Sequence, residues 1–396
     1  MPYRLSFRIY RRSFKQPLQT HHGRWSIREG ILLRLMDANG QVGFGEIAPL
    51  PWFGSETLAQ ALTFCQQLPD EITPETIFSI PTEANAHCPL PACRFGFESA
   101  LKFITDRATG CNSKLKTQNI SFGDASRFWN AEGYTKLKIS YSGLLPAGEA
   151  ALTAWESLWL RGYRTFKWKI GVAPLLQELM LFDRLAQTIE AKAAETGSAV
   201  SLRLDANGGL TVAEAEQWLQ RCDRIQQSSI FRRTSEAGIE QSAALSSPGS
   251  FPGSFPGSLQ VEFLEQPLPV DRFGAMLALA RHYATPLALD ESVATVAQLE
   301  RCYQEGWQGI FAIKPAIAGS PARLRQFCRN NPIDLVFSSV FETAIGRQAV
   351  LDLALETLSL SEKPQALRAV GFGIHHWFCE DDDLDSYDPE QLWQSL

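Results

Sequence analysis

Three stretches of the chain share one pattern: Leu202–Asp205 reads LRLD, Glu262–Glu265 reads EFLE and Leu287–Asp290 reads LALD. Each is a short segment of strand-forming character that ends in a carboxylate. The carboxyl ends of parallel strands meet at one rim of a barrel, so we expect these three acids to converge there. One acid after a strand is weak evidence, because helix caps also use acids at such positions. The same feature on three successive strands indicates a site.

The acids Asp205, Glu265 and Asp290 predict a divalent metal site. Three carboxylates held close together repel one another strongly unless a cation neutralises them. Ligation by oxygen alone suits a hard ion, so we expect Mg²⁺, with Mn²⁺ as a substitute. The histidine pairs at 21–22 and 375–376 do not lie at zinc-like spacing from a cysteine or a third histidine.

The part of the chain after residue 118 alternates short β-branched or aromatic segments with amphipathic helices, which is typical of repeated βα units. Eight such strands favour a closed barrel over an open sheet, so the predicted class is α/β, a (β/α)8-type (modified TIM) barrel. The strands are predicted at Lys136–Ser140, Thr165–Ile170, Ser201–Asp205, Val261–Glu265, Leu287–Asp290, Gly309–Lys314, Asp334–Ser338 and Leu367–Gly371.

The N-terminal part has a different pattern. Apolar and polar residues alternate over Tyr3–Tyr10, Gly30–Met36 and Gln41–Glu46, which predicts an antiparallel meander. Helices are expected near Thr57–Gln67 and Cys93–Thr109. We therefore predict an α+β capping domain at residues 1–118, a barrel domain at 119–371, and a C-terminal segment at 372–396 that packs back on the cap.

An insertion interrupts the barrel between its third and fourth strands. Residues 246–258 contain a tandem Ser-Phe-Pro-Gly repeat without helical or strand periodicity. We expect a flexible insert at about residues 226–258. A surface expansion is the simpler interpretation, and a partner-binding segment is the alternative.

Composition limits the range of partners. The chain of 396 residues is 45% hydrophobic and 20% charged, as in ordinary globular proteins, and its net charge of -6 does not favour nucleic acid or an anionic membrane. It has no long apolar run and no secretory pattern at its start, so a cytoplasmic location is expected. The eight cysteines form no Cys-x-x-Cys pair and are expected to be free. Whether the chain is a monomer or a homo-oligomer stays open.

Lysines end two further strands. In the segment Lys167–Lys169 both ammonium groups lie on one face, because strand side chains alternate, and Lys314 ends the Gly309–Lys314 strand at the same rim. Burial and a nearby cation lower a lysine pKa and make it a usable base. Lysines on both sides of an anionic substrate could remove an α-proton and stabilise the enolate. The lysines at 136 and 138 have the same spacing, so the motif alone does not identify the site. Lys167 and Lys169 are selected because they lie at the end of a strand.

Together these motifs resemble the enolase superfamily. The order is KWK at 167–169, DAN at 205–207, EQP at 265–267, DES at 290–292 and KP at 314–315. Four further phrases are similar to the o-succinylbenzoate synthase family: REG at 28–30, GFGEIAPLP at 43–51, LLP at 144–146 and SSVFETAIG at 338–346. The resemblance covers nearly the whole chain apart from the repeat.

The resemblance implies a reaction and a set of roles. Asp205, Glu265 and Asp290 would bind Mg²⁺, Lys169 would be the base, and Lys314 would face the enolate from the other side. The substrate would be a small anion, 2-succinyl-6-hydroxy-2,4-cyclohexadiene-1-carboxylate, dehydrated to 2-succinylbenzoate on the way to menaquinone or phylloquinone. The implied substrate-binding residues are Lys167, Ser338, Ser339, Trp52, Phe53, Leu145 and Asn207.

Two alternatives stay open. An N-succinylamino acid racemase or a dipeptide epimerase of the same superfamily needs the same two lysines, so the motifs do not separate these activities from dehydration. A non-catalytic binding protein on a retired barrel is the second alternative, but such a chain should have lost a lysine or a metal-binding acid, and this one keeps them all. The histidines at 21–22 and the ending at 377–383 depart from the family pattern.

Overall fold

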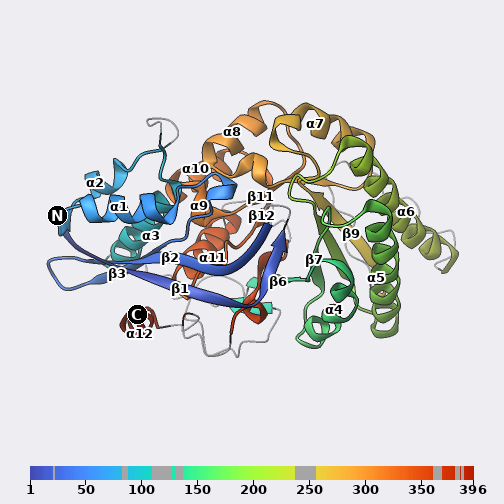
Figure 1. The fold of residues 1–396 in the computed structure, drawn as a ribbon, viewed down its shortest axis with the longest axis horizontal. Helices are drawn as coiled ribbons and strands as arrows, with labels where there is room; N and C mark the ends of the chain where they lie inside the picture. The colour runs from blue at the N-terminus through green and yellow to red at the C-terminus, as the bar shows by residue number, and fades with distance from the viewer. Residues whose placement is uncertain are drawn as a thin grey trace.

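The computed structural model describes residues 1–20, 23–82, 88–108, 126–129, 137–236, 256–359, 368–379, 384 and 388–396. Figure 1 shows two parts, a layer of long strands with small helices at the N-terminal end and a barrel ringed by helices. None of the helices in the described ranges is long and apolar enough to cross a membrane.

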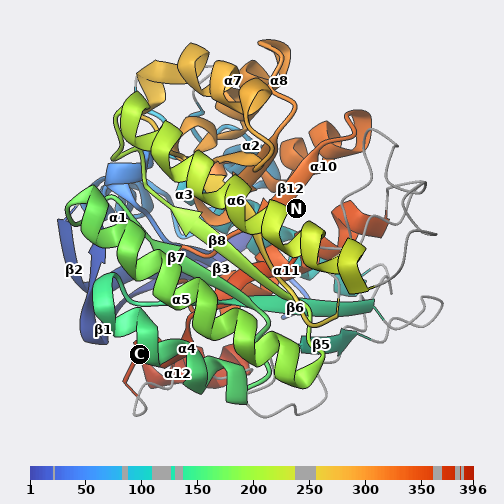
Figure 2. The ribbon, with the colours of Figure 1, turned by 90° about the vertical axis from the view of Figure 1, so that its right-hand side faces the viewer.

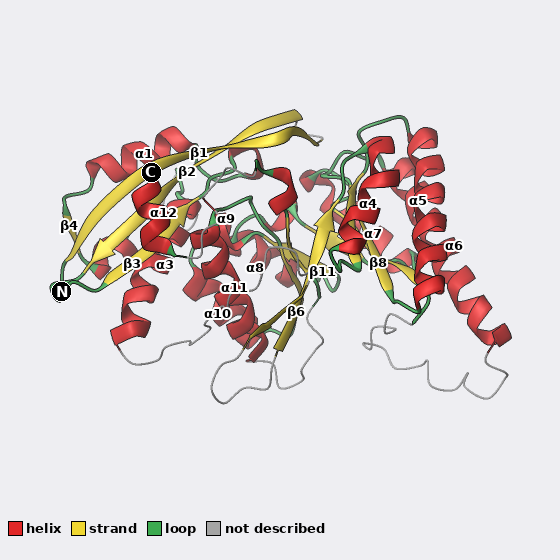
Figure 3. Ribbon diagram, turned by 90° about the horizontal axis from the view of Figure 1, so that it is seen from below, coloured by secondary structure: helices red, strands yellow, loops and turns green. Residues whose placement is uncertain are grey.

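The cap is built on an antiparallel sheet in the order β3-β2-β1-β4. Its strands are β1 (Tyr3–Thr20), β2 (Gly23–Met36), β3 (Val42–Ile47) and β4 (Glu71–Ile72). The predicted meander is confirmed, but β1 and β2 run well past the predicted ends. Their extra length forms a hairpin that reaches beyond the rest of the sheet, as seen in Figure 3.

Three helices cover one side of the cap sheet: α1 (Leu58–Gln67), α2 (Pro74–Phe78) and α3 (Pro91–Ala108). Helix α3 lies directly on β3 because Gly43 and Gly45 have no side chains there. A Cβ on Gly43 would lie 2.2 Å from the carbonyl oxygen of Ala100, and one on Gly45 would lie 2.0 Å from that of Gly96. The two glycines therefore set how closely helix and sheet approach.

The barrel has eight parallel strands in the order β12-β11-β10-β9-β8-β7-β6-β13, and a short strand β5 (Ser126–Trp129) pairs with β6. An isolated parallel bridge between Ser338 and Gly371 joins the two ends of this series. The predicted (β/α)8-type barrel with a cap is confirmed. The strands are β6 (Leu137–Leu144), β7 (Thr165–Lys169), β8 (Val200–Asp205), β9 (Leu259–Glu265), β10 (Leu287–Leu289), β11 (Ile310–Ile313), β12 (Asp334–Phe337) and β13 (Val370–Gly373).

Helices surround the barrel, and Figure 2 shows α5 and α6 in front of the strands β7 and β8. The barrel helices are α4 (Ala151–Leu160), α5 (Leu175–Thr196), α6 (Val212–Glu236), α7 (Phe273–His282), α8 (Val296–Gln304), α9 (Pro315–Ala318), α10 (Pro321–Asn330) and α11 (Ala344–Ser359). Helix α6 continues to Glu236, so the first part of the predicted insert is helical, and the bounds of the insert stay a prediction. Most of the Ser-Phe-Pro-Gly repeat lies outside the described residues.

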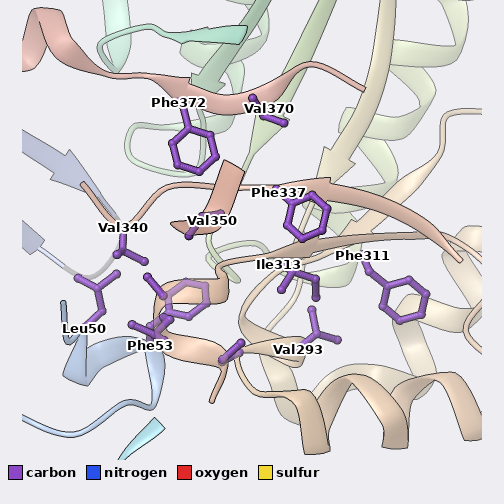
Figure 4. Close-up of a cluster of buried hydrophobic side chains, with 14 of the residues drawn as sticks. Leu50, Phe53, Val293, Phe311, Ile313, Phe337, Val340, Val350, Val370 and Phe372 are labelled. Carbon is purple, nitrogen blue, oxygen red and sulfur yellow. The ribbon is translucent and has the colours of Figure 1, made fainter. Parts of the chain in front are cut away.

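Apolar side chains at the upper end of the barrel pack against the cap. Figure 4 shows Leu50 of the cap next to Val340, and both belong to one buried cluster that also includes Phe53 of the cap and Ile313 of the barrel. At the other side of the cap, helix α12 (Pro389–Ser395) brings the Trp393 ring 6.2 Å from that of Phe44. Barrel, cap and C-terminal helix thus share buried surfaces, which fixes the cap over the carboxyl ends of the strands.

Candidate active site

The three predicted metal-binding acids meet at the carboxyl ends of adjacent strands. Asp205 ends β8, Glu265 ends β9 and Asp290 follows β10 directly. All three are buried, with 0%, 1% and 1% of their surface exposed. One oxygen from each lies within 4.8 Å of the others. Strand order alone therefore creates a compact, oxygen-only cluster.

Three lysines lie against the three acids. Lys167 Nζ is 2.9 Å from Asp205 and 2.7 Å from Glu265. Lys169 Nζ donates to Asp205 Oδ2 and to Asn207 Oδ1, both at 2.7 Å. Lys314 donates to both carboxylate oxygens of Asp290. Lys167 and Lys169 come from β7 on one side of the acids, and Lys314 follows β11 on the other.

Burial and neighbouring charges shift the pKa values of the three acids in different directions. Burial raises the pKa of Glu265 to about 8, with Asp205 and Asp290 adding to the rise against the lowering effect of Lys167. Burial also raises the pKa of Asp290, although Lys314 opposes it. Burial would raise the pKa of Asp205 too, but Lys167 and Lys169 outweigh it and the net shift is downward. In this arrangement Asp205 keeps its charge and the other two acids are hard to ionise.

The pKa of Lys167 is raised, which is the opposite of the predicted direction. Burial alone would lower it, but the carboxylates of Asp205, Glu265 and Asp290 outweigh burial and the net pKa is raised. The predicted lowering of the lysine pKa by burial is thus wrong for Lys167, because the sequence argument did not include the acids that pair with it.

The acid cluster fits a hard divalent cation. Its donors are all carboxylate oxygens, they come from three rigid strand ends, and they lie close enough for one ion to contact all three. The raised pKa values of Glu265 and Asp290 show that charge on these acids is not fully compensated by the lysines. A divalent cation would supply the missing compensation.

Asp205 and the three lysines line a cavity between the barrel and the cap, with side chains from both parts in its walls. Of the predicted substrate-binding residues, Lys167, Asn207, Ser338, Ser339, Trp52 and Phe53 line it. Leu145 does not: it is fully buried in the core, and its neighbour Leu144 faces the cavity instead. Strand β6 runs to Leu144, so the predicted strand end at Ser140 gave no basis for choosing between the two leucines.

Further lining residues were not predicted: Leu18, Trp25, Ser142, Phe341, Gly371 and Ile374. Leu18 and Trp25 come from the extended β1–β2 hairpin, where they are register partners. Their sequence signal was the continued strand pattern beyond Tyr10, which the prediction cut short. The ring of Trp25 lies 5.1 Å from that of Trp52 and 5.3 Å from that of Phe341, so the hairpin joins the other cavity walls.

A cap residue, Phe53, contacts Lys314 directly. Lys314 Nζ lies 3.8 Å from the centre of the Phe53 ring, within the distance of a cation–π interaction. Phe53 ends a short 3-10 helix at Pro51–Phe53. The segment after it is anchored by Glu56, whose buried carboxylate accepts hydrogen bonds from the N–H groups of Ala92 and Cys93 at the start of α3.

The spacing-matched pair at 136 and 138 is placed differently. Residue 136 lies outside the described residues, and Lys138 is near the start of β6, where it pairs with Phe128 of β5. Since β6 continues to Leu144, Lys138 is far along the strand from the rim. The histidines at 21–22 also lie outside the described residues.

Family models match both parts of the chain. Residues 6–104 match the model described as MenC, N-terminal domain. Residues 256–374 match the model described as Enolase C-terminal domain-like. These matches cover most of the cap and the half of the barrel that carries Glu265, Asp290 and Lys314.

Whole-chain relatives agree with the models. The o-succinylbenzoate synthase of Thermosynechococcus vestitus is 36% identical over 400 residues, covering 99% of each chain. A crystal structure of the Thermosynechococcus elongatus o-succinylbenzoate synthase, complexed with Mg in its active site, matches with a TM-score of 0.70 and 35% identity over 99% of this chain and 100% of that one. The substrate-liganded L-Ala-D/L-Glu epimerase of Bacillus subtilis covers 96% of this chain and 91% of its own at a TM-score of 0.64, but its 17% identity supports the fold alone. This chain belongs to the o-succinylbenzoate synthase family of the enolase superfamily.

Proposed function

We propose that this protein is an o-succinylbenzoate synthase, which dehydrates 2-succinyl-6-hydroxy-2,4-cyclohexadiene-1-carboxylate to 2-succinylbenzoate. The observation that carries the proposal is the placement of Lys169 and Lys314 on opposite sides of the acid cluster, both facing one cavity. The reaction needs a base for the α-proton and a positive charge where the enolate forms.

Lys169 is the proposed base. It is held by two hydrogen bonds, to Asp205 and Asn207, and the Asn207 amide is oriented in turn by its own donation to Glu291 Oε1 at 3.0 Å. The amine therefore has a fixed direction toward the cavity, which reduces the cost of reaching a reactive geometry. Lys167 lies beside it and would bind the substrate carboxylate.

Lys314 has the opposite role. It contacts the Asp290 carboxylate and the face of the Phe53 ring, two groups that attract a cation. A permanent cation on this face would stabilise the negative charge that develops as the proton leaves. The leaving hydroxyl departs in a favourable step because the product ring is aromatic.

The metal proposed for this site is Mg²⁺, held by Asp205, Glu265 and Asp290, with Mn²⁺ as a substitute. When bound, it supplies positive charge that binds the substrate carboxylate and weakens the hold of Asp205 and Asp290 on the lysines. The surrounding residues exclude water and orient the substrate, with the aromatic side chains of the cap forming the cover.

The proposal also includes a pathway, a cellular location and a division into domains. The product would serve menaquinone or phylloquinone synthesis, and the enzyme would work in the cytoplasm. We divide the chain into a cap at about residues 1–118, a catalytic barrel that ends with β13 at Gly373, and a C-terminal segment.

The test is direct. Purified protein is given the cyclohexadiene acid with Mg²⁺, and the aromatic product is followed by ultraviolet absorbance and identified by mass spectrometry. Turnover supports the proposal, and its absence with folded, Mg²⁺-loaded protein contradicts it.

Racemisation of N-succinylamino acids is a second candidate, because two lysines on opposite sides of one cavity also suit proton removal from one face and return to the other. Loss of optical rotation with an N-succinylamino acid would establish it, and a retained rotation alongside dehydration would exclude it.

A further inference from the structure

The loop after β12 contains a buried carboxyl group that the proposed mechanism does not use. Glu342 is 1% exposed and lies in the segment that carries the cavity-lining residues Ser338, Ser339 and Phe341. Its Oε2 is 2.5 Å from Ser339 Oγ and accepts the Val340 N–H at 2.7 Å. Its Oε1 is buried without a hydrogen-bonding partner among the described residues. Oε2 thus has two hydrogen-bonding neighbours, and Oε1 has none among the described residues.

A second buried carboxylate lies next to it. Glu46 of β3 accepts the Tyr10 hydroxyl at 2.5 Å, the Thr343 N–H at 3.0 Å, the Thr343 hydroxyl at 2.5 Å and the Gly346 N–H at 3.0 Å. A Cβ on Gly346 would lie 2.6 Å from Glu46 Oε2 and 3.0 Å from Glu342 Cβ, so the Glu46 carboxylate lies near the base of the Glu342 side chain. Two buried anions this close repel one another. Glu46 accepts from four donors, whereas Glu342 has one oxygen with no donor among the described residues, so Glu342 is the acid whose geometry suits a bound proton.

The position of that proton follows from hydrogen-bond satisfaction. A proton on Oε1 would be a buried donor without an acceptor, which costs more than an unsatisfied carbonyl oxygen. A proton on Oε2 would be donated to Ser339 Oγ, and Oε2 could still accept the Val340 N–H. Burial and the nearby Glu46 charge also raise the pKa of Glu342, against the lowering effect of the Ser339 and Val340 hydrogen bonds.

We propose that Glu342 is a positioning residue whose neutral carboxyl donates to Ser339 Oγ and so leaves the Ser339 hydroxyl hydrogen free to bind an acceptor oxygen of the substrate. Ser339 Oγ also accepts the Phe341 N–H at 2.8 Å, so both of its lone pairs are used within the loop. The hydroxyl hydrogen then has only the cavity to point into. The succinyl end of the proposed substrate offers ketone and carboxylate oxygens, which only accept. This inference rests on the proposed function, and it names how one wall of the site recognises the substrate.

The loop geometry supports a dedicated arrangement. Phe341 has a φ of +63°, in the left-handed region that a bulky aromatic residue rarely adopts. Its N–H bond to Ser339 Oγ and the Glu342 contacts hold that conformation in place. Gly371 allows the close approach of the neighbouring β13 strand, because a Cβ there would lie 3.0 Å from Ser338 Oγ.

Glu342→Gln separates this proposal from a purely structural role. The glutamine amide oxygen can accept from both Val340 and Ser339, so the loop keeps the two hydrogen bonds that an ionised Glu342 would accept. Its NH₂ group cannot replace the acid, since it would face the Val340 N–H donor. The variant therefore turns the Ser339 hydrogen away from the cavity, and thermal unfolding shows whether the fold tolerates the amide NH₂ at the Oε1 position.

The experiment titrates 2-succinylbenzoate into Mg²⁺-loaded wild type, Glu342→Gln, Ser339→Ala and the double variant by calorimetry. We expect Glu342→Gln to weaken binding by about tenfold, as loss of one hydrogen bond to an anion does, to raise KM with kcat nearly unchanged, and to have no further effect in the Ser339→Ala background. The control is Glu98→Gln. Glu98 is a buried cap carboxylate that accepts a hydrogen bond from Ser320 and does not line the cavity, so the Kd of this variant should equal that of wild type.

An unchanged Kd in Glu342→Gln would overturn the proposal, as would an additive double variant. Failure of the wild type to bind the product would instead contradict the proposed function. If Glu342→Gln does not fold, ¹³C NMR of glutamate-labelled wild type decides: a Glu342 carboxyl carbon in the neutral form near pH 7 supports the proposal, and an ionised one refutes it.

Discussion

Removal of the Lys169 amine is the sharpest chemical perturbation that the site offers. In Lys169→Ala, Asp205 loses one hydrogen bond but keeps Lys167 at 2.9 Å and the Asn207 N–H at 3.0 Å, so the acid stays paired. The cost in stability should be about 1.5–3 kcal/mol, that of one hydrogen bond between charged groups. Substrate binding should persist because the acids and the other cavity walls are unchanged.

The loss should therefore fall on kcat. A positioned general base contributes about 10²- to 10⁴-fold, which corresponds to roughly 2.7–5.5 kcal/mol of barrier. Steady-state dehydration kinetics in Mg²⁺ give kcat and KM, calorimetry with 2-succinylbenzoate gives Kd, and thermal unfolding shows whether the variant is folded. The matched control is Lys138→Ala on β6, which lies far along the strand from the rim and should change kcat by less than about tenfold. An inactive Lys138→Ala together with an active Lys169→Ala would refute the assignment of the base.

The other predictions concern the cap and the outer helices. Phe53→Leu removes the ring 3.8 Å from Lys314 and should lower kcat/KM by about 2- to 30-fold, the range of a cation–π interaction of about 0.5–2 kcal/mol; an unchanged value would show that the ring does not act on the lysine. Glu46→Ala leaves four buried donors without an acceptor, at about 1 kcal/mol or more each, so it should lower the free energy of unfolding by several kcal/mol in a denaturation assay. The control Glu29→Ala removes an exposed ion pair and should cost at most about 1 kcal/mol in the same assay. Burial raises the pKa of Asp352 to about 7, so the folded protein holds a proton there that the unfolded chain releases above about pH 4, and Asp352 destabilises the fold increasingly between those values. Asp352→Asn should accordingly be more stable than wild type at about pH 8 by roughly 1 kcal/mol or more and similar at about pH 4; equal unfolding curves at about pH 8 would contradict the shift.

The barrel and the acid cluster could be predicted from sequence because both depend on local pattern plus one topological rule. A parallel barrel brings the ends of consecutive strands together whatever lies between them. Asp205, Glu265 and Asp290 therefore converge even though an insertion separates the first two along the chain. The eight strands were found for the same reason, since their apolar cores are independent of the loops.

Strand ends were harder to predict, because they are decided by partners far along the chain. Strand β6 continues to Leu144 through its pairing with β7, and this places Leu144 and not Leu145 in the cavity. Strand β1 continues past Tyr10 because β2 pairs with it as far as Gly23, although the exposed side there has little apolar character. Alternation inside one strand can indicate that the strand continues, but the pairing with its neighbour decides where it ends.

Electrostatic details were the least accessible part. The sequence predicts lysines near acids, but the sign of the pKa shift at Lys167 depends on distances below 3 Å to two carboxylates on other strands. Glu342 of the barrel and Glu46 of the cap both approach Gly346 although they are 296 positions apart, and no local motif connects them.

The central claim is that the three acids hold a divalent ion that the lysine chemistry requires. Its most direct test is the rate of 2-succinylbenzoate formation from the cyclohexadiene acid by purified protein, first stripped with excess chelator and then supplied with Mg²⁺. The account predicts that turnover disappears in chelator and returns on addition of Mg²⁺ to wild type, but does not return in Asp290→Asn, which keeps the side-chain shape and removes one charged ligand. Full turnover in excess chelator, or an Asp290→Asn enzyme as active as wild type, would contradict it.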